Sequence, residues 1–391
     1  MKQSLSVGID IGSSMTRVVV TESVAPDGGH PRIIAVGTAE TRGMRHGYVV
    51  NRDDATMSLV AALRDAEREL GTRIKSAAIA ISGIGLQSVY STGSAIASRA
   101  DGIISKLDIE KAIQDAEGQI DLKNKAILHA FPVVFKVDGK ELPTRPDGMQ
   151  GLRLEVKTLF VTCFQQHLDD ILAVVSDAGV KVINFTATPI ATQKLLLTDL
   201  QRNFGCALID IGAETVSLSV YENNTLTTLH VFGIGSLDIT KDIALGLRIT
   251  PEEAESIKLG TVSFQSVPKK KLDEIIEARL SDIFELIDKF LRKIGRSGLL
   301  PSGAIIIGGG SLSSMIEPVA KTMLKIPVRL GHVDIPSTKS PIKDPRFLLA
   351  YAIATNNVEQ QGNKQRIRSS APGSDEGFIA VIKDFFKQLM P

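Results

Sequence analysis

The chain has 391 residues, of which 43% are hydrophobic and 23% charged, so it can bury one large core or two cores divided by a cleft. A formal net charge of +1 gives no global positive field of the kind that drives non-specific nucleic-acid binding, and we expect no nucleic-acid partner. The two cysteines, Cys163 and Cys206, lie far apart in apolar runs, which predicts reduced packing residues in a cytosolic protein rather than a disulfide framework.

The N-terminal region does not resemble a signal peptide, because its first apolar run, Leu5 to Ile11, is interrupted by Asp10. The sequence also has no apolar stretch long enough to span a bilayer. We therefore expect any contact with a membrane to be made from its surface.

In chain order, residues 5–22 predict two β-branched strands joined by a Gly/Ser turn, and residues 33–39 predict a third strand. Apolar residues recur at helical spacing over 53–70, behind an acidic first turn, which predicts a long helix. Residues 86–162 differ in character: a polar helix precedes a strand, a turn and further strand-like runs. We expect a separate small α/β module there.

Residues 165–187 predict a helix followed by a strand, after which the opening pattern of the chain begins again at Cys206. Helical periodicity then dominates residues 251–295, and a glycine-rich segment and a last helix follow. A polar segment at 356–376, rich in Gln, Asn, Ser, Gly and Pro, is expected to be disordered.

One short pattern occurs twice, about 200 residues apart, as Gly8-Ile9-Asp10-Ile11-Gly12-Ser13-Ser14 and as Leu208-Ile209-Asp210-Ile211-Gly212-Ala213-Glu214. This repetition predicts two related domains. A glycine at the turn lets backbone N–H groups approach phosphate oxygens closely. The aspartate would hold the waters of a Mg²⁺ ion or orient an attacking water. We therefore expect both aspartates to face one cleft, although a single copy would more often be an ordinary hairpin.

Two further features have both a functional and a structural interpretation. The segment Ile305 to Ser311 contains three glycines between a buried strand and a helix, which suits a nucleotide base or ribose lying against backbone. Its alternative is a tight strand-to-helix turn. Glu255 and Lys258 place a carboxylate and an ammonium on adjacent turns of one helix, an arrangement that by itself is usually a solvated face.

Two DIG hairpins, an E-x-x-K helix and a late GGGS turn, in this order, resemble the ATPase fold shared by actin, heat-shock protein 70 and sugar kinases. Within that superfamily, the chain resembles the bacterial cell-division protein FtsA over nearly its whole length. The tract from Arg42 to Asn51 is similar to the family segment that precedes the first long helix. Other similar segments are Ile127-Leu128-His129, Phe131-Pro132, Val137-Asp138-Gly139, Gly148-Met149, Gly151 to Glu155, Ile239 to Ala244 and Ile275 to Arg279.

This resemblance implies an α/β, actin-like fold of two duplicated lobes around a nucleotide cleft, with a small inserted α/β subdomain, 1C, in place of subdomain 1B. The implied boundaries are 1–83, 164–190 and 335–355 for subdomain 1A, 84–163 for 1C, 191–245 and 301–334 for 2A, 246–300 for 2B, 356–376 for a disordered linker and 377–391 for an amphipathic helix.

The resemblance also implies ATP and Mg²⁺ as cofactors. The cofactor-binding residues would be Asp10, Gly12, Ser13, Ser14, Asp210, Gly212, Thr215, Glu255, Lys258, Gly308, Gly309 and Gly310. Asp10 and Asp210 would hold Mg²⁺ through water, and Asp210 is the candidate catalytic residue.

The implied partners are further copies of the chain, in actin-like filaments, and the C-terminal peptide of the tubulin-like protein FtsZ. The FtsZ contact would lie in the subdomain that contains the 269–294 helix. Arg279, Lys269 and Lys270 are the candidate contacts, and the alternative for each is a solvated basic face.

The chain departs from the family pattern in two places. Ala213 and Glu214 replace two glycines of the second hairpin, and Glu214 would bring negative charge towards phosphate unless its side chain turns away or holds the metal. Repulsion at short range in a partly buried cleft could cost about 1 kcal/mol or more. Thr188 occupies the position of a family glutamate that helps to place metal and water, which predicts slow hydrolysis or none, with binding retained.

The C-terminal residues 377–391 predict an amphipathic helix lying in a bilayer interface. The resemblance implies that this helix binds the cytoplasmic face of the membrane at the division site. Its alternative is a helix docked on the body of the protein, but a polar linker of about twenty residues reaches roughly 25 Å and argues for the membrane. The candidate membrane-binding residues are Phe378, Ile379, Ile382, Phe385, Phe386, Leu389, Lys383 and Lys387. Val381 and Met390 lie on the apolar half of the helix, and Asp384 lies with the two lysines on the polar half.

Three functions compete for this sequence. The preferred one is a membrane tether and filament scaffold for FtsZ, with ATP as a structural ligand. The second is an ATPase or kinase of the same fold, which the missing glutamate at Thr188 disfavours. The third is a scaffold resembling the pilus-assembly protein PilM, which is expected to lack a detachable terminal helix.

The six histidines are scattered without metal-ligand spacing, so the sequence does not predict a histidine metal site.

Overall fold

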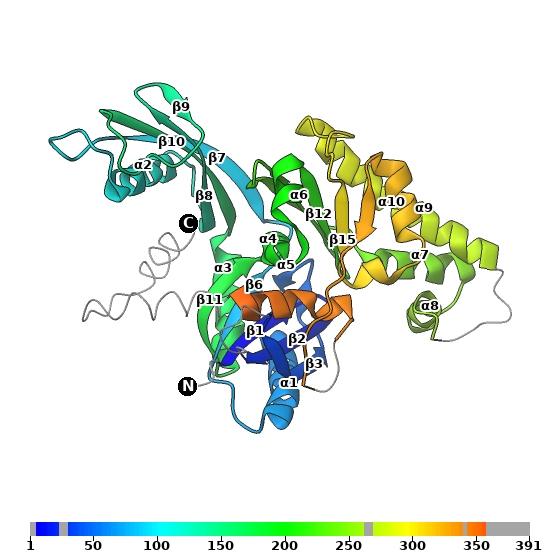
Figure 1. Ribbon diagram of the computed structural model, residues 1–391. Coiled ribbons are helices and arrows are strands. Elements are labelled where there is room, and N and C mark those ends of the chain that lie inside the picture. Colours follow the sequence, from blue (N-terminus) through cyan, green and yellow to red (C-terminus); the bar gives the residue numbers. More distant parts are fainter. Residues whose placement is uncertain (1–4, 23–29, 262–268, 339–341, 357–391) are drawn as a thin grey trace.

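The computed structural model describes residues 5–22, 30–261, 269–338 and 342–356, which form two lobes and a projecting module (Figure 1). The first lobe contains a mixed sheet with the strand order β11-β6-β1-β2-β3. These strands are β1 (Leu5–Ile11), β2 (Met15–Glu22), β3 (Arg32–Glu40), β6 (Ser76–Ile81) and β11 (Lys181–Ala187). A short hairpin of β4 (Met44–Arg45) and β5 (Tyr48–Val49) follows β3.

The second lobe repeats the topology of the first. Its strands lie in the order β16-β15-β12-β13-β14, so that in each lobe the opening strand pairs antiparallel with the next strand and parallel with a much later one. The duplication predicted from the two DIG patterns is therefore confirmed. The bounds are β12 (Cys206–Ile211), β13 (Val216–Glu222), β14 (Thr225–Phe232), β15 (Ala304–Ile307) and β16 (Val328–Leu330).

The inserted module is a four-stranded antiparallel unit covered by one helix. Its strands are β7 (Gln87–Ile96), β8 (Lys125–Val137), β9 (Lys140–Leu142) and β10 (Arg153–Phe164), and its helix is α2 (Lys106–Gly118). The chain enters the module from β6 and leaves it into α3 (Gln165–Asp177), both elements of the first lobe. Strand β7 nevertheless pairs with β14 of the second lobe, at Gln87 and His230.

Helices cover both faces of the first sheet because glycines let them approach closely. Helix α1 (Arg52–Leu70) packs on β3, where a β-carbon at Gly37 would lie 2.0 Å from the carbonyl oxygen of Ala62. The helix at 348–356 lies against β1 (Figure 1), where a β-carbon at Gly8 would lie 2.1 Å from the carbonyl oxygen of Ala350. Only glycine fits at these two contacts, since real β-carbons do not approach so closely.

The second lobe has helices on one face of its sheet and short connecting helices on the other. Its main helices are α7 (Ser236–Leu247), α8 (Pro251–Lys258), α9 (Lys269–Lys293) and α10 (Ile316–Leu324). The connecting helices are α4 (Thr188–Ala191), α5 (Gln193–Leu196) and α6 (Asp199–Phe204), and the 3₁₀ turn η1 (Gly309–Leu312) follows β15. A second 3₁₀ turn, η2 (Pro345–Phe347), leads into the 348–356 helix of the first lobe.

The hydrophobic cores follow this division. The core of the first lobe extends to one face of the second sheet, where Cys206 and Leu208 join it. Their strand neighbours Ala207 and Ile209 face the opposite way, into a second core with α9 and α10. The inserted module has a third core of its own, around Phe160.

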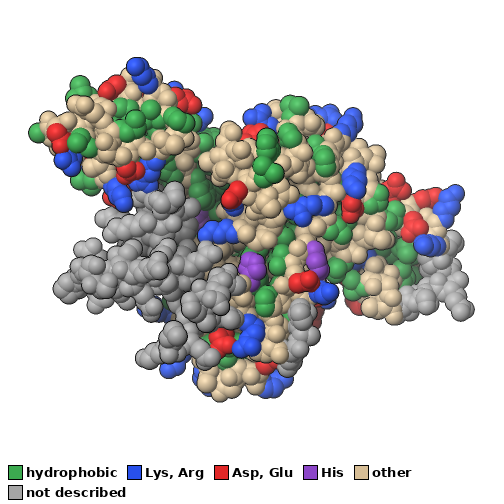
Figure 2. Space-filling model, viewed as in Figure 1, with side chains coloured by type: hydrophobic (Ala, Val, Ile, Leu, Met, Phe, Trp, Pro, Cys, Tyr) green, Lys and Arg blue, Asp and Glu red, His purple; other side chains and the backbone are tan. Residues whose placement is uncertain are grey.

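Most elements expected from periodicity are present, including the helix at 53–70 and the strands of the duplicated hairpins. Strand β7 and helix α7 were not predicted. Cys163 and Cys206 are free and buried, as expected. In the view of Figure 2, charged side chains of both signs are interspersed over the described surface.

The terminal segments are largely outside the described residues. The amphipathic helix predicted at 377–391 lies there, as does all of the 356–376 linker after its first residue. Among the helices within the described ranges, none is long and apolar enough to cross a membrane.

Candidate functional site

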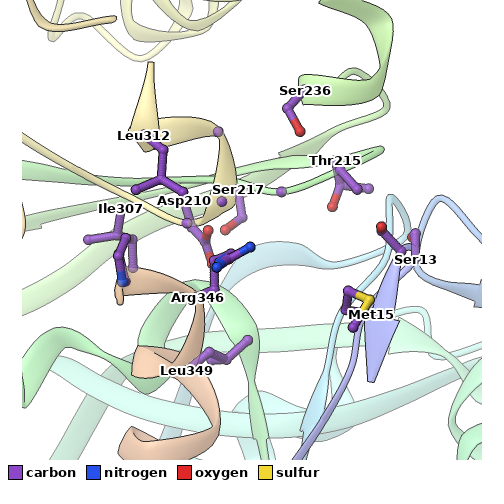
Figure 3. A pocket seen from close by; sticks show the side chains of 18 of the residues that line it. Ser13, Met15, Asp210, Thr215, Ser217, Ser236, Ile307, Leu312, Arg346 and Leu349 are labelled. Carbon is purple, nitrogen blue, oxygen red and sulfur yellow. The ribbon is translucent and has the colours of Figure 1, made fainter. Parts of the chain in front are cut away.

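A cavity of about 640 Å³ lies between the two lobes. Its lining includes all twelve residues that the sequence assigned to the cofactor site, from Asp10 to Gly310. Figure 3 shows side chains of both lobes around it, with Ser13 and Met15 from the first lobe and Thr215 and Ser236 from the second. Segments about 300 residues apart in the chain therefore meet at one site.

The two glycine turns have the same local geometry. In the first, the Gly12 N–H donates to the Met15 carbonyl at 3.2 Å, and in the second the Gly212 N–H donates to the Thr215 carbonyl at 2.9 Å. The second turn is also fixed by helix α7, because the N–H of Ser236 donates to the Gly212 carbonyl at 2.9 Å. The N-terminus of α7, which carries partial positive charge, thus begins at the cavity.

The aspartates of the two turns, Asp10 and Asp210, both line the cavity. Burial raises the pKa of Asp10 to about 6, an effect that the charge of Arg17 opposes. Burial and then the charge of Asp10 raise the pKa of Asp210 to about 7, again against Arg17. Two carboxyl groups whose pKa values rise together share a site where negative charge lacks full compensation, which a bound cation would provide.

The donor set around these aspartates fits a magnesium ion. Ser217 stands opposite Asp210 in the β12–β13 pair, lines the cavity and is only 6% exposed. Its hydroxyl finds no hydrogen-bond partner within the described part of the chain. A hard oxygen site of two carboxylates and a buried hydroxyl suits Mg²⁺ that keeps several of its waters. Among the described residues, no cluster of three or more His, Cys, Asp or Glu side chains could bind a metal directly.

The third glycine turn packs against Asp210. Gly308 has a φ of +88°, and a β-carbon there would lie 2.2 Å from Asp210 Oδ1. A β-carbon at Gly310 would lie 2.3 Å from Ile211 Cγ2. These glycines let the β15–η1 turn approach the second phosphate turn, so these two glycine-rich segments form one wall of the cavity, and the Gly12 turn lines it from the other lobe.

The Glu255–Lys258 pair is not a solvated face. The Lys258 side chain is 12% exposed, and its Nζ lies 2.7 Å from Glu255 Oε2. The same Nζ donates to Thr240 Oγ1 at 2.8 Å and to the Ser236 carbonyl at 3.2 Å, while the Thr240 hydroxyl donates to Glu255. This network joins α8 to the first turns of α7 and fixes one wall of the cavity.

The two departures from the family pattern have definite positions in the structure. Glu214 is absent from the cavity lining, because its carboxylate accepts a hydrogen bond from the N–H of His46 at 2.6 Å. The side chain has thus turned away from the site. Thr188 does line the cavity, and its hydroxyl donates to the Ile81 carbonyl at 3.0 Å. A neutral hydroxyl therefore stands at the position for which the resemblance implies a carboxylate.

Two cations of the site were not predicted. Arg17 stands opposite Asp10 in the β1–β2 pair and lines the cavity, so counting residues across the hairpin would have found it. Arg346 enters from η2 of the first lobe, near Gly309, and Asp344 binds its guanidinium at 2.7 Å. Arg346 belongs to no motif, and only the fold brings it to the cavity (Figure 3).

The candidate FtsZ contacts lie outside this cavity, on α9. Arg279 is engaged within the chain, since its Nε and Nη2 donate to Asp242 of α7 at 2.5 and 3.0 Å. Lys269 and Lys270 are exposed at the start of the helix, and Lys270 lies 3.9 Å from Glu274. Ten residues of helix place Arg279 about 15 Å from Lys269.

Comparison with known proteins identifies the family. The family model described as "Cell division protein FtsA" matches residues 207–352, and the model described as "SHS2 domain inserted in FTSA" matches residues 83–162. The chain belongs to the FtsA family. FtsA of Bacillus subtilis is 29% identical over 384 residues, which cover 92% of this chain and 86% of that protein. FtsA of Pseudomonas aeruginosa is 27% identical over 401 residues, which cover 96% and 95%.

Solved structures support the actin-like fold of this FtsA family member. The PilM–PilN type IV pilus biogenesis complex matches with a TM-score of 0.68 and 18% identity, over 90% of this chain and 98% of that one. MreB 5 of Spiroplasma citri bound to AMPPNP matches with a TM-score of 0.53 and 11% identity, over 93% and 98%. At these identities the likeness establishes the fold alone. The module at 83–162 is the insertion characteristic of FtsA, which confirms the predicted architecture.

Proposed function

We propose that this chain binds ATP with Mg²⁺ between its lobes, assembles into actin-like filaments, and tethers FtsZ filaments to the cytoplasmic membrane at the division site. The observation that carries this proposal is the convergence of three glycine-rich turns, two aspartates and the Glu255–Lys258 network on one cavity. Membership of a cell-division family supports the cellular role. We also propose that the chain is divided into subdomains 1A, 1C, 2A and 2B at the boundaries that the resemblance implies.

The site suits a nucleotide triphosphate in the following way. The Gly12 and Gly212 turns would hold the phosphates from opposite lobes, with help from the hydroxyls of Ser13, Ser14 and Thr215. The third turn and the Glu255–Lys258 wall would hold the base and ribose. Mg²⁺, when bound, supplies positive charge beside the phosphates, and Asp10 and Asp210 would hold its waters. Arg17 would then face both carboxylates and phosphate.

We propose that hydrolysis is slow or absent. Asp210 is the candidate that orients an attacking water, but Thr188 cannot act as a second carboxylate there. Because phosphoryl transfer depends on positioning and charge stabilisation, a neutral hydroxyl at this position leaves binding intact and weakens turnover. ATP would then act as a structural ligand that favours assembly.

The membrane and FtsZ contacts rest on other parts of the chain. The 377–391 helix would bind the bilayer reversibly, since a few interfacial side chains contribute only a few kcal/mol against the ordering of a short helix. A filament would array many such helices and gain avidity. Lys269, Lys270 and Arg279 of α9 would contact the C-terminal peptide of FtsZ.

The test uses the full chain and a variant lacking residues 377–391. The full chain should sediment with anionic liposomes and recruit FtsZ to them, more strongly with ATP, whereas the truncated chain should bind FtsZ peptide but no liposomes. Liposome binding that survives the truncation would favour a PilM-like scaffold. ATP turnover at many molecules per second would favour an ATPase or kinase.

A further inference from the structure

The second phosphate turn touches the opposite lobe through one residue. Glu214 Oε2 accepts a hydrogen bond from the N–H of His46 at 2.6 Å, and the Glu214 carbonyl oxygen lies 3.1 Å from His46 Nδ1. The two residues are 168 positions apart in the chain and belong to different lobes. Both contacts are partly buried, so water competes with them less than at the surface.

His46 lies in a turn that connects to the first phosphate turn as well. His46 and Gly47 form the two-residue turn of the β4–β5 hairpin, with φ values of +48° and +81°. The N–H of Gly47 donates to Ser13 Oγ at 3.2 Å. Successive N–H groups of this hairpin therefore contact one residue from each phosphate turn, Glu214 from the second lobe and Ser13 from the first.

The second turn is hydrogen-bonded to the start of helix α7. The carbonyls of Gly212 and Ala213 accept hydrogen bonds from the first N–H groups of α7, at 2.9 and 2.8 Å. A β-carbon at Gly235 would lie 2.4 Å from the Ala213 carbonyl oxygen, so the turn and the helix start are in close contact. A contact made by Glu214 thus holds the turn and α7 together against the first lobe.

We propose that Glu214 is a positioning residue that, through His46, ties the second phosphate turn to the first lobe. The contact has two consequences. It orders the turn before a phosphate arrives, which lowers the ordering cost of binding. It also keeps the Glu214 carboxylate out of the phosphate site, which removes the repulsion that a glutamate at this position would otherwise cause.

The first test needs no nucleotide. Hydrogen exchange of the full chain is measured over the 44–49 hairpin for the wild type, Glu214→Ala and Glu214→Gln. A hydrogen bond to a charged acceptor is worth about a tenfold change in local opening or more. We expect Glu214→Ala to speed exchange of the His46 N–H by about that factor, and Glu214→Gln, which keeps an acceptor oxygen, to restore most of the protection. Unchanged exchange in Glu214→Ala would overturn the proposal.

A variant of the partner residue guards against misfolding of the alanine variant. His46→Gly removes the imidazole but keeps the N–H donor, and glycine tolerates the positive φ. We expect its hairpin exchange to lie between those of the wild type and Glu214→Ala. If Glu214→Ala is folded and its hairpin exchanges as slowly as that of the wild type, and His46→Gly does the same, the contact is rejected.

The second test rests on the proposed function and uses ATP and ADP with Mg²⁺. We expect Glu214→Ala to bind ATP about tenfold more weakly than the wild type, because the turn is no longer ordered in advance, and Glu214→Gln to recover wild-type affinity or exceed it. A merely structural glutamate would change stability in Glu214→Ala and leave its ATP affinity unchanged. If the wild type binds neither nucleotide, the proposed ATP site fails, while the exchange measurement still decides the Glu214–His46 contact. Equal ATP affinity in all three proteins would overturn the positioning role.

Discussion

Gly308 lies directly against the carboxylate of Asp210, with space for a hydrogen atom but not for a methyl group on its Cα. Gly308→Ala must therefore move either the β15–η1 turn or Asp210. We expect the variant to fold and to bind ATP at least about tenfold more weakly, which corresponds to 1.4 kcal/mol. Titration calorimetry with ATP and Mg²⁺ measures this change.

A matched glycine separates steric from backbone effects in this experiment. Gly295 has a φ of +70°, but a β-carbon there meets nothing within 4 Å. Gly295→Ala should cost stability through its left-handed backbone, on the order of 1 kcal/mol, and leave ATP affinity unchanged. Equal affinities of the Gly308 and Gly295 variants would contradict the close contact with Asp210.

The raised pKa values of Asp10 and Asp210 predict how stability depends on pH without nucleotide. The unfolded chain releases both protons near pH 4, whereas the folded protein keeps them until about pH 6 and 7. The stabilisation is therefore complete below pH 4 and is lost as pH rises to about 7. Between pH 5 and 8, the free energy of unfolding should therefore fall less in Asp210→Asn than in the wild type, by at least about 1 kcal/mol. Urea unfolding at several pH values measures it.

Added Mg²⁺ should stabilise the protein more as pH rises, which is opposite to the effect of pH on the same two carboxyl groups without the ion. Because the carboxylates must release their protons to face a cation, the stabilisation by added Mg²⁺ should grow from pH 5 to pH 8 in the wild type. It should be smaller in Asp210→Asn at every pH. A Mg²⁺ effect that is equal in both proteins would show that the ion binds elsewhere.

The ion pair between Arg279 and Asp242 allows a direct test of the FtsZ surface. If Arg279 contacts the FtsZ peptide, Arg279→Ala should weaken peptide binding, whereas Asp242→Asn should leave it unchanged or strengthen it by freeing the guanidinium. A purely internal role predicts that both variants lower stability by about 1 kcal/mol or less, since the pair is partly exposed. Fluorescence anisotropy with the peptide, alongside thermal unfolding, distinguishes these outcomes.

Substitutions of Thr188 test whether hydrolysis is slow because the site lacks a carboxylate at this position. Thr188→Glu places a carboxylate at the cavity wall, and we expect ATP turnover to rise by about tenfold or more if a water-orienting group is what the site lacks. Thr188→Gln is the control of similar size without the charge. Turnover that is equally slow in both variants would mean that another feature limits hydrolysis.

Repetition made the fold predictable from sequence. The two DIG patterns predicted two related lobes and two aspartates facing one cleft, because a duplicated hairpin places the same residue at the same point of each sheet. Arg17 could also have been predicted, because the hairpin register puts it opposite Asp10. Strand β7 was missed because Gly93 and its polar neighbours weaken the strand pattern. That glycine is needed because a β-carbon there would lie 2.1 Å from the Ala112 carbonyl of α2.

The sequence did not predict which distant segments the side chains of Glu214 and Arg346 contact. The sequence left open whether Glu214 brings its charge towards phosphate or turns away, because the position of its carboxylate depends on His46 in the other lobe. Arg346 reaches the cavity from a loop without any motif, close to Gly309 of the other lobe. Local patterns give the type of each element, whereas these side chains are placed by the way in which the lobes meet.

The inserted module belongs to both lobes at once. Its two covalent connections lead to the first lobe, and its strand pairing, at Gln87 and His230, leads to the second. Strand β7 extends for ten residues, or about 33 Å, from that junction. Over this length, a turn of about 5° at Gln87 would displace the far end by about 3 Å. A small rotation of one lobe against the other would therefore produce its largest displacement at the far end of this module.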